Sequence, residues 1–107
     1  MYQRKTETEL SSEEQIARIR MPRGKEVFGE ILQLHGDRRM KVACSDGKER
    51  MCRVPGRLKR KLWVRVGDIV IVEPWPIQGD EKGDLIWRYN HVQAAYIRKK
   101  GYLTQND

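Results

Sequence analysis

A run of cationic side chains is the feature of this sequence with the clearest chemistry. Trp63 lies within the run, which has no acidic residue between positions 50 and 65. The cations are Arg50, Arg53, Arg57, Lys59, Arg60, Lys61 and Arg65. Positive side chains can neutralise phosphates and a neighbouring indole can stack on a base, which is the combination that RNA-binding modules use. The alternative interpretation is a solvated face that binds nothing.

Other kinds of chemistry have little support. No G-x-S-x-G, H-E-x-x-H or G-x-G-x-x-G motif occurs. Cys44 and Cys52 form no C-x-x-C pair, and His35 and His91 are the only histidines that could join them as ligands. The carboxylates between positions 80 and 84 are interpreted as an exposed acidic turn. The sequence therefore predicts no catalytic activity, no metal site and no cofactor.

The composition agrees with a polyanionic partner. The 107 residues include 22 Lys and Arg against 15 Asp and Glu, a formal net charge of +7. A chain of this length suits one domain. No apolar run approaches the ~20 residues of a membrane span, and the N-terminus has no apolar signal segment. We therefore expect a soluble, cytoplasmic protein with no membrane contact, in which both thiols are buried apolar groups.

Five short strands are expected to position the cations. Apolar and β-branched patterns typical of strands cover residues 26–34, 40–44, 49–54, 68–73 and 84–89. The first pattern is apolar on both faces and has Gly29 in its middle, which suits a strand that bends between two halves of a barrel. There is no βαβ spacing. The pattern predicts an all-β domain with a small α component, namely a five-stranded OB-fold (S1-like) barrel.

The turn between the second and third strands decides which side chains face outward. A three-residue loop, Ser45-Asp46-Gly47, separates apolar from basic residues, whereas a two-residue loop mixes them. The three-residue register pairs Cys44 with Lys48, Val42 with Arg50 and Met40 with Cys52. It places Met40, Val42, Cys44, Cys52 and Val54 inside, and Arg39, Lys41, Met51 and Arg53 outside. The outer cations of this hairpin should therefore be continuous with the basic run.

The ends of the chain are expected to lie outside the RNA-binding domain, which we assign to residues 25–90. Residues 1–24 are predicted to be a flexible tail; the alternative is a short helix capped by Ser11-Ser12-Glu13-Glu14. A helix over 91–101 should pack on the barrel, because Asn90 and Gln93 resemble a capping box and Gly101 suits its end. Residues 102–107 form a short tail.

The tryptophans differ in their expected exposure. If the aliphatic residues at positions 62, 64 and 66 face the core, Trp63 and Arg65 face outward together. The sequence leaves exposure and burial of Trp63 equally open. Trp75 begins a loop, where it closes one end of the barrel or contacts a partner. Trp87 lies in the middle of a strand and is expected in the core.

The stretch from Glu26 to Leu103 resembles translation initiation factor 1A of archaea and eukaryotes, which is related to bacterial initiation factor 1. The segments that carry the resemblance are CSDGKERMCRVPGRLKRKLWVRVGDIVIV, DLIWRYN and AAYIRKKGYL. The most specific pattern is Asp46-Gly47, Cys52 and then Gly56-Arg57-Leu58-Lys59-Arg60-Lys61-x-Trp63. The eukaryotic form has a long acidic C-terminal tail that meets a GTPase initiation factor. This chain stops at Asp107, so it resembles the shorter archaeal form, and the resemblance does not extend to that contact.

The resemblance implies a translation initiation factor that binds the small ribosomal subunit at the A site, contacts RNA of the decoding region, and assists assembly of the initiation complex and start-codon selection. It leaves contacts with other initiation factors open, and we expect a monomer. By resemblance, the RNA-facing loop is formed by Arg57, Lys59, Arg60, Lys61 and Trp63. The register and the basic run add Arg39, Lys41, Arg53 and Arg65.

Two rival functions remain. A general single-strand-binding module of the cold-shock or S1 type would carry several exposed aromatic side chains on its sheet, whereas the outer residues of the central hairpin are Arg, Lys and Met. A structural or protein-interaction subunit would bind ribosomes without needing Lys59, Arg60 and Lys61.

Overall fold

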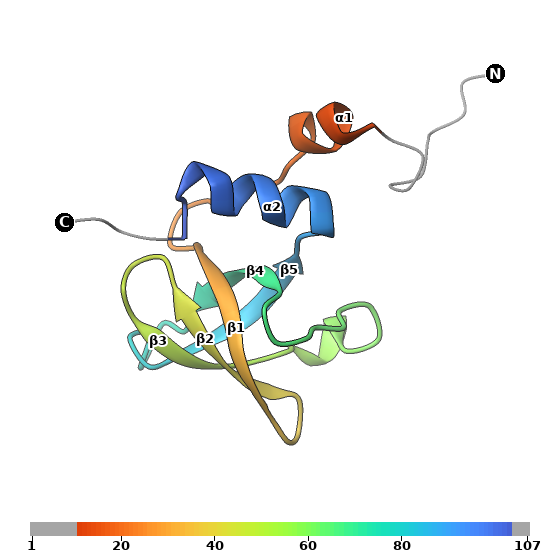
Figure 1. Cartoon of the computed structure of the whole chain (residues 1–107). Helices are drawn as coiled ribbons and strands as arrows, with labels where there is room; N and C mark the ends of the chain where they lie inside the picture. The colour runs from red at the N-terminus through yellow and green to blue at the C-terminus, as the bar shows by residue number, and fades with distance from the viewer. Residues whose placement is uncertain (1–10, 104–107) are drawn as a thin grey trace.

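Five strands form a closed barrel. In the computed structural model of this chain, residues 11–103 are described, so the predicted tails lie partly outside the described residues, at 1–10 and 104–107. The strands are β1 (Val27–His35), β2 (Arg39–Cys44), β3 (Glu49–Arg53), β4 (Ile69–Pro74) and β5 (Lys82–Arg88). They close in the order β1-β2-β3-β5-β4, and only the β3–β5 pair is parallel. The predicted fold class is confirmed (Figure 1).

Strand β1 closes the barrel because its two edges pair with different strands. Gly29 lies opposite Cys44 of β2 and Val70 of β4. A β-carbon at Gly29 would lie 2.5 Å from Val42 Cγ1 and 3.1 Å from Val72 Cγ2, so there is no space for a side chain. The glycine therefore lets β1 curve closely over the packed interior, as its place in the sequence predicted.

The hairpin of β2 and β3 has the predicted register. The paired residues are Met40 with Cys52 and Val42 with Arg50, and the Cys44 N–H donates to the Lys48 carbonyl at 2.8 Å. Gly47 has φ 86°, the left-handed conformation that a three-residue loop requires. This turn thereby fixes which hairpin side chains reach the outer surface.

The interior of the barrel is apolar. Its buried side chains are Ile31, Met40, Val42, Cys44, Cys52, Val70, Val72 and Leu85, with Val54 partly buried against them. Burial raises the pKa of the Cys44 thiol and raises the pKa of Cys52 to about 12. Both thiols therefore stay neutral near pH 7 and pack as small apolar groups, as expected.

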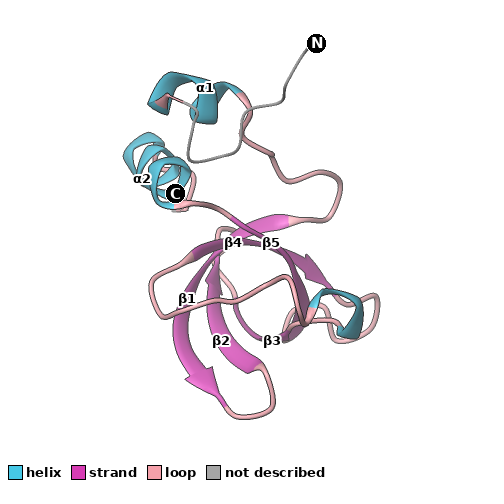
Figure 2. Cartoon of the chain, turned by 90° about the vertical axis from the view of Figure 1, so that its right-hand side faces the viewer, coloured by secondary structure: helices cyan, strands magenta, loops and turns pink. Residues whose placement is uncertain are grey.

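Helix α2 (His91–Lys100) covers the outside of the barrel beside β4 and β5 (Figure 2). Its Ile97 is buried in a second cluster that includes Phe28, Ile69, Ile71 and Tyr89. This cluster explains why β4 is apolar on both faces, since one face lines the barrel and the other lies under α2. The predicted caps are present: Asn90 forms a capping box and Gly101 ends the helix with φ 75°.

Residues 11–24 contain a helix, whereas the preferred prediction for this segment was a flexible tail. Helix α1 (Ser12–Ala17) begins at Ser11, whose hydroxyl accepts a hydrogen bond from the Glu14 N–H at 3.1 Å. The segment is attached to the barrel because the Tyr89 hydroxyl donates to the carbonyl of Arg20. The local cap and this long-range hydrogen bond favour the capped helix that the sequence offered as its alternative.

Trp87 lies at the surface and the prediction of a core position is wrong. Strands β4 and β5 pair Val72 with Leu85 but Ile71 with Trp87, so the register shifts at Ile86. This bulge reverses the alternation of side chains along β5. Leu85 therefore faces the interior, while Trp87 is 40% exposed and lies under the Arg20 guanidinium at 5.4 Å from its ring centroid.

Candidate nucleic-acid interface

The segment between β3 and β4 presents its cations because its apolar residues hold it against the barrel. It begins with a 3₁₀ turn over Gly56–Leu58, and the Leu62 N–H donates to the Leu58 carbonyl at 2.9 Å. Leu62 and Val64 pack against the interior cluster. The side chains between and around these anchors are exposed, namely Arg57, Lys59, Arg60, Lys61, Trp63 and Arg65. We name residues 57–65 the basic loop.

Trp63 is the most exposed aromatic side chain of residues 11–103, with 72% of its surface accessible. The structure thus answers the question that the sequence left open. Of the three aliphatic residues that the sequence weighed for the core, Leu62 and Val64 pack against it, whereas Val66 is 61% exposed. Leu62 and Val64 anchor this part of the loop on the barrel. The indole between them is exposed and can stack on a base.

A groove joins the basic loop to the end of the β1–β2 hairpin. It measures about 160 Å³, and its rim carries Arg38, Arg39, Lys59 and Trp63. The other lining residues are His35 and the apolar Leu34, Met40, Val54, Leu62 and Val64. Residues from three separate parts of the chain therefore present positive charge and an indole around one concavity.

Arg38 is a rim residue that the sequence did not single out. It has φ 58° and follows Asp37 with φ 60°, so the turn between β1 and β2 directs two successive arginines to the groove. Alternation from Arg39 would have placed Arg38 on the other face of the strand. The only available signal was the Gly36-Asp37 pair, which marks a turn but does not give its geometry.

Two of the predicted hairpin cations are ion-paired. Lys41 Nζ lies 3.2 Å from Glu49 Oε1. Arg53 Nε donates to Asp84 Oδ1 at 3.1 Å, and its guanidinium lies 5.0 Å from the Trp75 ring centroid. None of the ion pairs formed within residues 11–103 includes Arg39 or a cation of the basic loop. The basic loop and the groove thus carry positive charge that no ion pair within residues 11–103 neutralises.

Arg50 belongs to the basic run in sequence but not to the surface. Its side chain is 3% exposed, and its guanidinium binds both carboxylate oxygens of Asp46 at 2.9 and 2.8 Å. The hydrogen bond from Arg50 lowers the pKa of Asp46, and the same bond raises the pKa of Arg50. Arg50 Nε also donates to the Gly79 carbonyl. The residue therefore joins two loops and is unavailable to a ligand.

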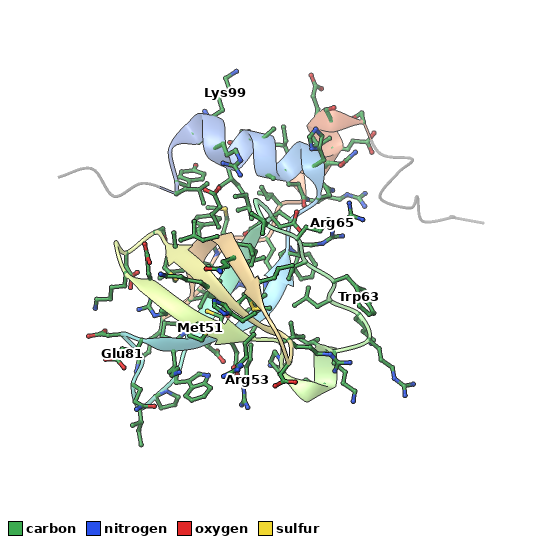
Figure 3. The ribbon with its side chains drawn as sticks, turned by 60° about the horizontal axis from the view of Figure 1, so that its bottom comes forward. Met51, Arg53, Trp63, Arg65, Glu81 and Lys99 are labelled. Carbon is green, nitrogen blue, oxygen red and sulfur yellow. The ribbon has the colours of Figure 1, made fainter. Side chains whose placement is uncertain are left out.

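The predicted site residues thus fall into two groups. Figure 3 shows Trp63 and Arg65 on one side of the barrel, Arg53 on its underside in this view and Glu81 on the other side. The structure brings Arg39, Lys59 and Trp63 around the groove and places Arg57, Arg60, Lys61 and Arg65 on the same loop. Lys41 and Arg53 lie on the adjoining hairpin, in ion pairs.

Residues 11–103 bring together no set of three or more His, Cys, Asp and Glu side chains that could hold a metal ion. They also form no helix with the length and apolar character needed to cross a bilayer.

Comparison with known proteins agrees with this arrangement. The family model described as Translation initiation factor 1A / IF-1 matches residues 5–107. Translation initiation factor 1A of Pyrococcus abyssi is 46% identical over 92 residues, which cover 86% of this chain and 81% of that protein. The factor of the same name from Methanococcus maripaludis strain C7 is 54% identical over 92 residues, or 84% of this chain and 88% of that one.

A solved structure is also similar. The solution structure of translation initiation factor 1 from the Wolbachia endosymbiont of Brugia malayi matches with a TM-score of 0.50 and 29% identity, covering 62% of this chain and 78% of that one. The barrel, the basic loop and these relatives lead to the same assignment. The chain belongs to the translation initiation factor 1A / IF-1 family.

Proposed function

We propose that this protein binds the small ribosomal subunit at the A site through ribosomal RNA of the decoding region, and that it promotes assembly of the initiation complex and start-codon selection in the cytoplasm. The observation that carries the proposal is the basic loop. Its cations are exposed and form no ion pair within residues 11–103, and Trp63 stands among them with 72% exposure.

The mechanism is passive docking by a monomer. Arg and Lys side chains of the basic loop and groove engage phosphates, which fixes the position of the barrel without reading a base sequence. Specificity comes from the shape of the folded RNA. A barrel that occupies the A site sterically blocks early entry of tRNA, so no group of the protein needs to transfer a proton or form a bond.

The rival function, general binding of single-stranded RNA, is less well supported by the surface. Such modules stack successive bases on several aromatic side chains. On the outer face of β2 and β3 the side chains are Arg39, Lys41, Ala43, Glu49, Met51 and Arg53, and Trp63 is the one Trp, Tyr or Phe residue that borders the groove. Charge therefore outweighs stacking in the expected affinity.

Sedimentation with purified small subunits at two salt concentrations tests the proposal. We expect wild-type binding to weaken steeply with salt, because each phosphate contact releases counterions. The variant Lys59→Ala/Arg60→Ala/Lys61→Ala should lose most binding at both concentrations. A charge-matched control, Lys25→Ala/Lys99→Ala/Lys100→Ala, removes three cations outside the basic loop and should bind nearly as the wild type does.

Three outcomes contradict the proposal in different ways. Equal loss in the two triple variants means that net charge alone drives binding. Unchanged binding of the loop variant favours a protein-interaction subunit. Affinity for an unstructured RNA equal to that for small subunits favours the general single-strand-binding module.

A further inference from the structure

The loop between β4 and β5 presents an isoleucine to solvent. Ile77 is 80% exposed, more than any other large hydrophobic side chain of residues 11–103. It follows Trp75 and Pro76, and Pro76 is exposed too. We name residues 75–81 the apolar ridge. Figure 3 shows Glu81, the last residue of the ridge, on the side of the barrel opposite Trp63.

The ridge is held by its own hydrogen bonds. The Trp75 N–H donates to the Lys82 carbonyl at 3.2 Å, and the Lys82 N–H donates to the Gln78 carbonyl at 2.8 Å. Trp75 Nε1 donates to Asp84 Oδ1 at 2.8 Å, the oxygen that also accepts from Arg53. The indole that begins the ridge is therefore fixed on the barrel.

Contacts from the β2–β3 turn and from β3 hold the far end of the ridge. Arg50 Nε donates to the Gly79 carbonyl, and Lys48 Nζ lies 2.7 Å from Asp80 Oδ1. A β-carbon at Gly79 would lie 2.5 Å from the Trp75 carbonyl oxygen, so the ridge is folded tightly on itself. A segment fixed in this way loses little conformational entropy when it binds. The exposed isoleucine is thus preorganised for a contact.

Two hollows border the ridge. One of about 330 Å³ is lined by Arg53, Trp75, Pro76, Ile77 and Asp84. The other, of about 540 Å³, is lined by Trp75, Pro76, Gln78, Gly79, Asp80 and Glu81. Trp75 and Pro76 border both, so the surface around the exposed isoleucine is uneven and offers room for side chains of another molecule.

The charges around the ridge decide between RNA and protein as the occupant. Glu73 and Glu81 are exposed and have no ion-pair partner within residues 11–103, and the Asp80 side chain is 76% exposed beside Lys48. The arginine that borders the ridge, Arg53, is already bound by Asp84. The ridge lies away from the basic loop, so its carboxylates would repel the phosphates of an RNA that approached it. The same carboxylates attract lysine and arginine side chains, which favours a protein as the occupant.

We propose that the apolar ridge is a protein-docking element, and that its occupant is a protein of the small-subunit initiation complex that presents an apolar socket rimmed by lysine and arginine. Ile77 enters the socket and Glu73 and Glu81 meet the rim. The proposal rests on the proposed function, because the complex brings the two proteins together. The barrel thereby binds RNA on one side and protein on the other.

Site-specific photocrosslinking tests the occupant. Ile77 is replaced by benzoylphenylalanine, and the full chain is irradiated in initiation complexes assembled in an extract of Methanococcus maripaludis. We expect a crosslink to one protein, with the linked peptide mapping to an apolar surface flanked by Lys or Arg. Benzoylphenylalanine in place of Val66, which is 61% exposed beside Arg65, is the control and should form no crosslink to that protein. Crosslinks from position 77 to RNA, or to no protein, overturn the proposal.

Affinity for the same complexes provides the second measurement. Ile77→Ser should weaken binding about 5- to 20-fold, as expected for a central apolar contact, whereas Val66→Ser should leave it unchanged. Glu73→Gln/Glu81→Gln should weaken binding and reduce the Ile77 crosslink. Equal affinities of Ile77→Ser and wild type also overturn the proposal. If Lys59→Ala/Arg60→Ala/Lys61→Ala still binds small subunits, the proposed function fails. That result is separate from a failure of the ridge proposal, which the Ile77 variants decide.

Discussion

Arg50 and Arg53 show that sequence position alone does not make a cation available to RNA. The two residues lie three positions apart on β3, so alternation sends Arg50 inward and Arg53 outward. Arg50 is bound by Asp46 through two nitrogens of its guanidinium, and Arg53 is bound by Asp84. The cations of the basic loop differ because the chain there follows no strand, and none of their side chains forms an ion pair with a carboxylate of residues 11–103.

The Asp46–Arg50 pair should contribute strongly to folding stability. Asp46→Asn removes the charge that compensates a guanidinium with 3% exposure, and breaking a buried pair from one side costs about 3 kcal/mol. Asp80→Asn is the matched control, because it breaks the exposed pair with Lys48 and should cost less than about 1 kcal/mol. Urea unfolding at pH 7 measures both. Equal, small losses would show that the buried pair is not a stabilising contact.

Acid should remove the contribution of Asp46. Its pKa is lowered by the hydrogen bond from Arg50, so the folded state holds the carboxylate more acidic than the unfolded state does. The stabilisation is therefore complete above the unfolded pKa of about 3.9 and is lost as pH falls through the lower folded pKa. The difference in unfolding free energy between wild type and Asp46→Asn should shrink as the pH falls below about 4. A constant difference would contradict this assignment.

At the scale of elements, the sequence predicted the five strands of the barrel and the register of its central hairpin. The alternation of apolar and basic side chains, together with the Asp46-Gly47 turn, was sufficient to predict the β2–β3 register. A one-residue slip would have turned the apolar side chains of both strands toward solvent. Alternation failed where an extra residue enters a strand. The bulge at Ile86 moved Trp87 outward, and the turn after Gly36 brought Arg38 to the groove. Such local departures depend on the partner strand, which a single segment does not reveal.

The helix before β1, which the sequence offered only as an alternative, was hard to predict for a related reason. Its own residues provide a capping box but little apolar surface, which favoured the prediction of a tail. The ordering contacts come from residues far along the chain, including Tyr89 and Gln93. For the site, the basic loop could be predicted because it is contiguous in sequence. The groove could not, because its walls come from β1, β2 and the loop.

Gly29, in β1, should tolerate no side chain. Gly29→Ala forces a methyl group to within 2.5 Å of Val42 Cγ1, and the valines at 42 and 72 are both fully buried. Overpacking of this kind costs about 1–3 kcal/mol. Gly36→Ala is the control, since a β-carbon there meets no atom within 4 Å. Thermal unfolding should separate the two variants clearly, and a stable Gly29→Ala protein would mean that β1 can move away from β2.

At the scale of the whole molecule, the net charge of +7 is unevenly distributed. The cations of the basic loop and the arginines of the groove form no ion pair within residues 11–103, whereas the apolar ridge on the other side carries the unpaired carboxylate of Glu81. A net charge by itself would attract RNA from every direction. The uneven distribution instead favours one orientation of the barrel on RNA, because the ridge side repels phosphates.

This distribution predicts unequal salt effects from single changes of equal charge. Lys61→Ala removes an unpaired cation and should reduce the slope of log K against log salt by about 0.7–0.9. Lys41→Ala removes a cation that Glu49 holds at 3.2 Å. That cation must leave its ion pair before it meets a phosphate, so the slope should change less.

The double variant Lys41→Ala/Glu49→Ala completes the comparison, because it conserves net charge and should bind as the wild type does. Titration of small subunits over a series of salt concentrations gives the slopes. If Lys41→Ala and Lys61→Ala change the slope equally, binding follows net charge and not the local arrangement of unpaired cations. If the double variant alone loses affinity, the Lys41–Glu49 pair itself contacts the RNA, and the interface extends further over β2 and β3 than the basic loop and groove.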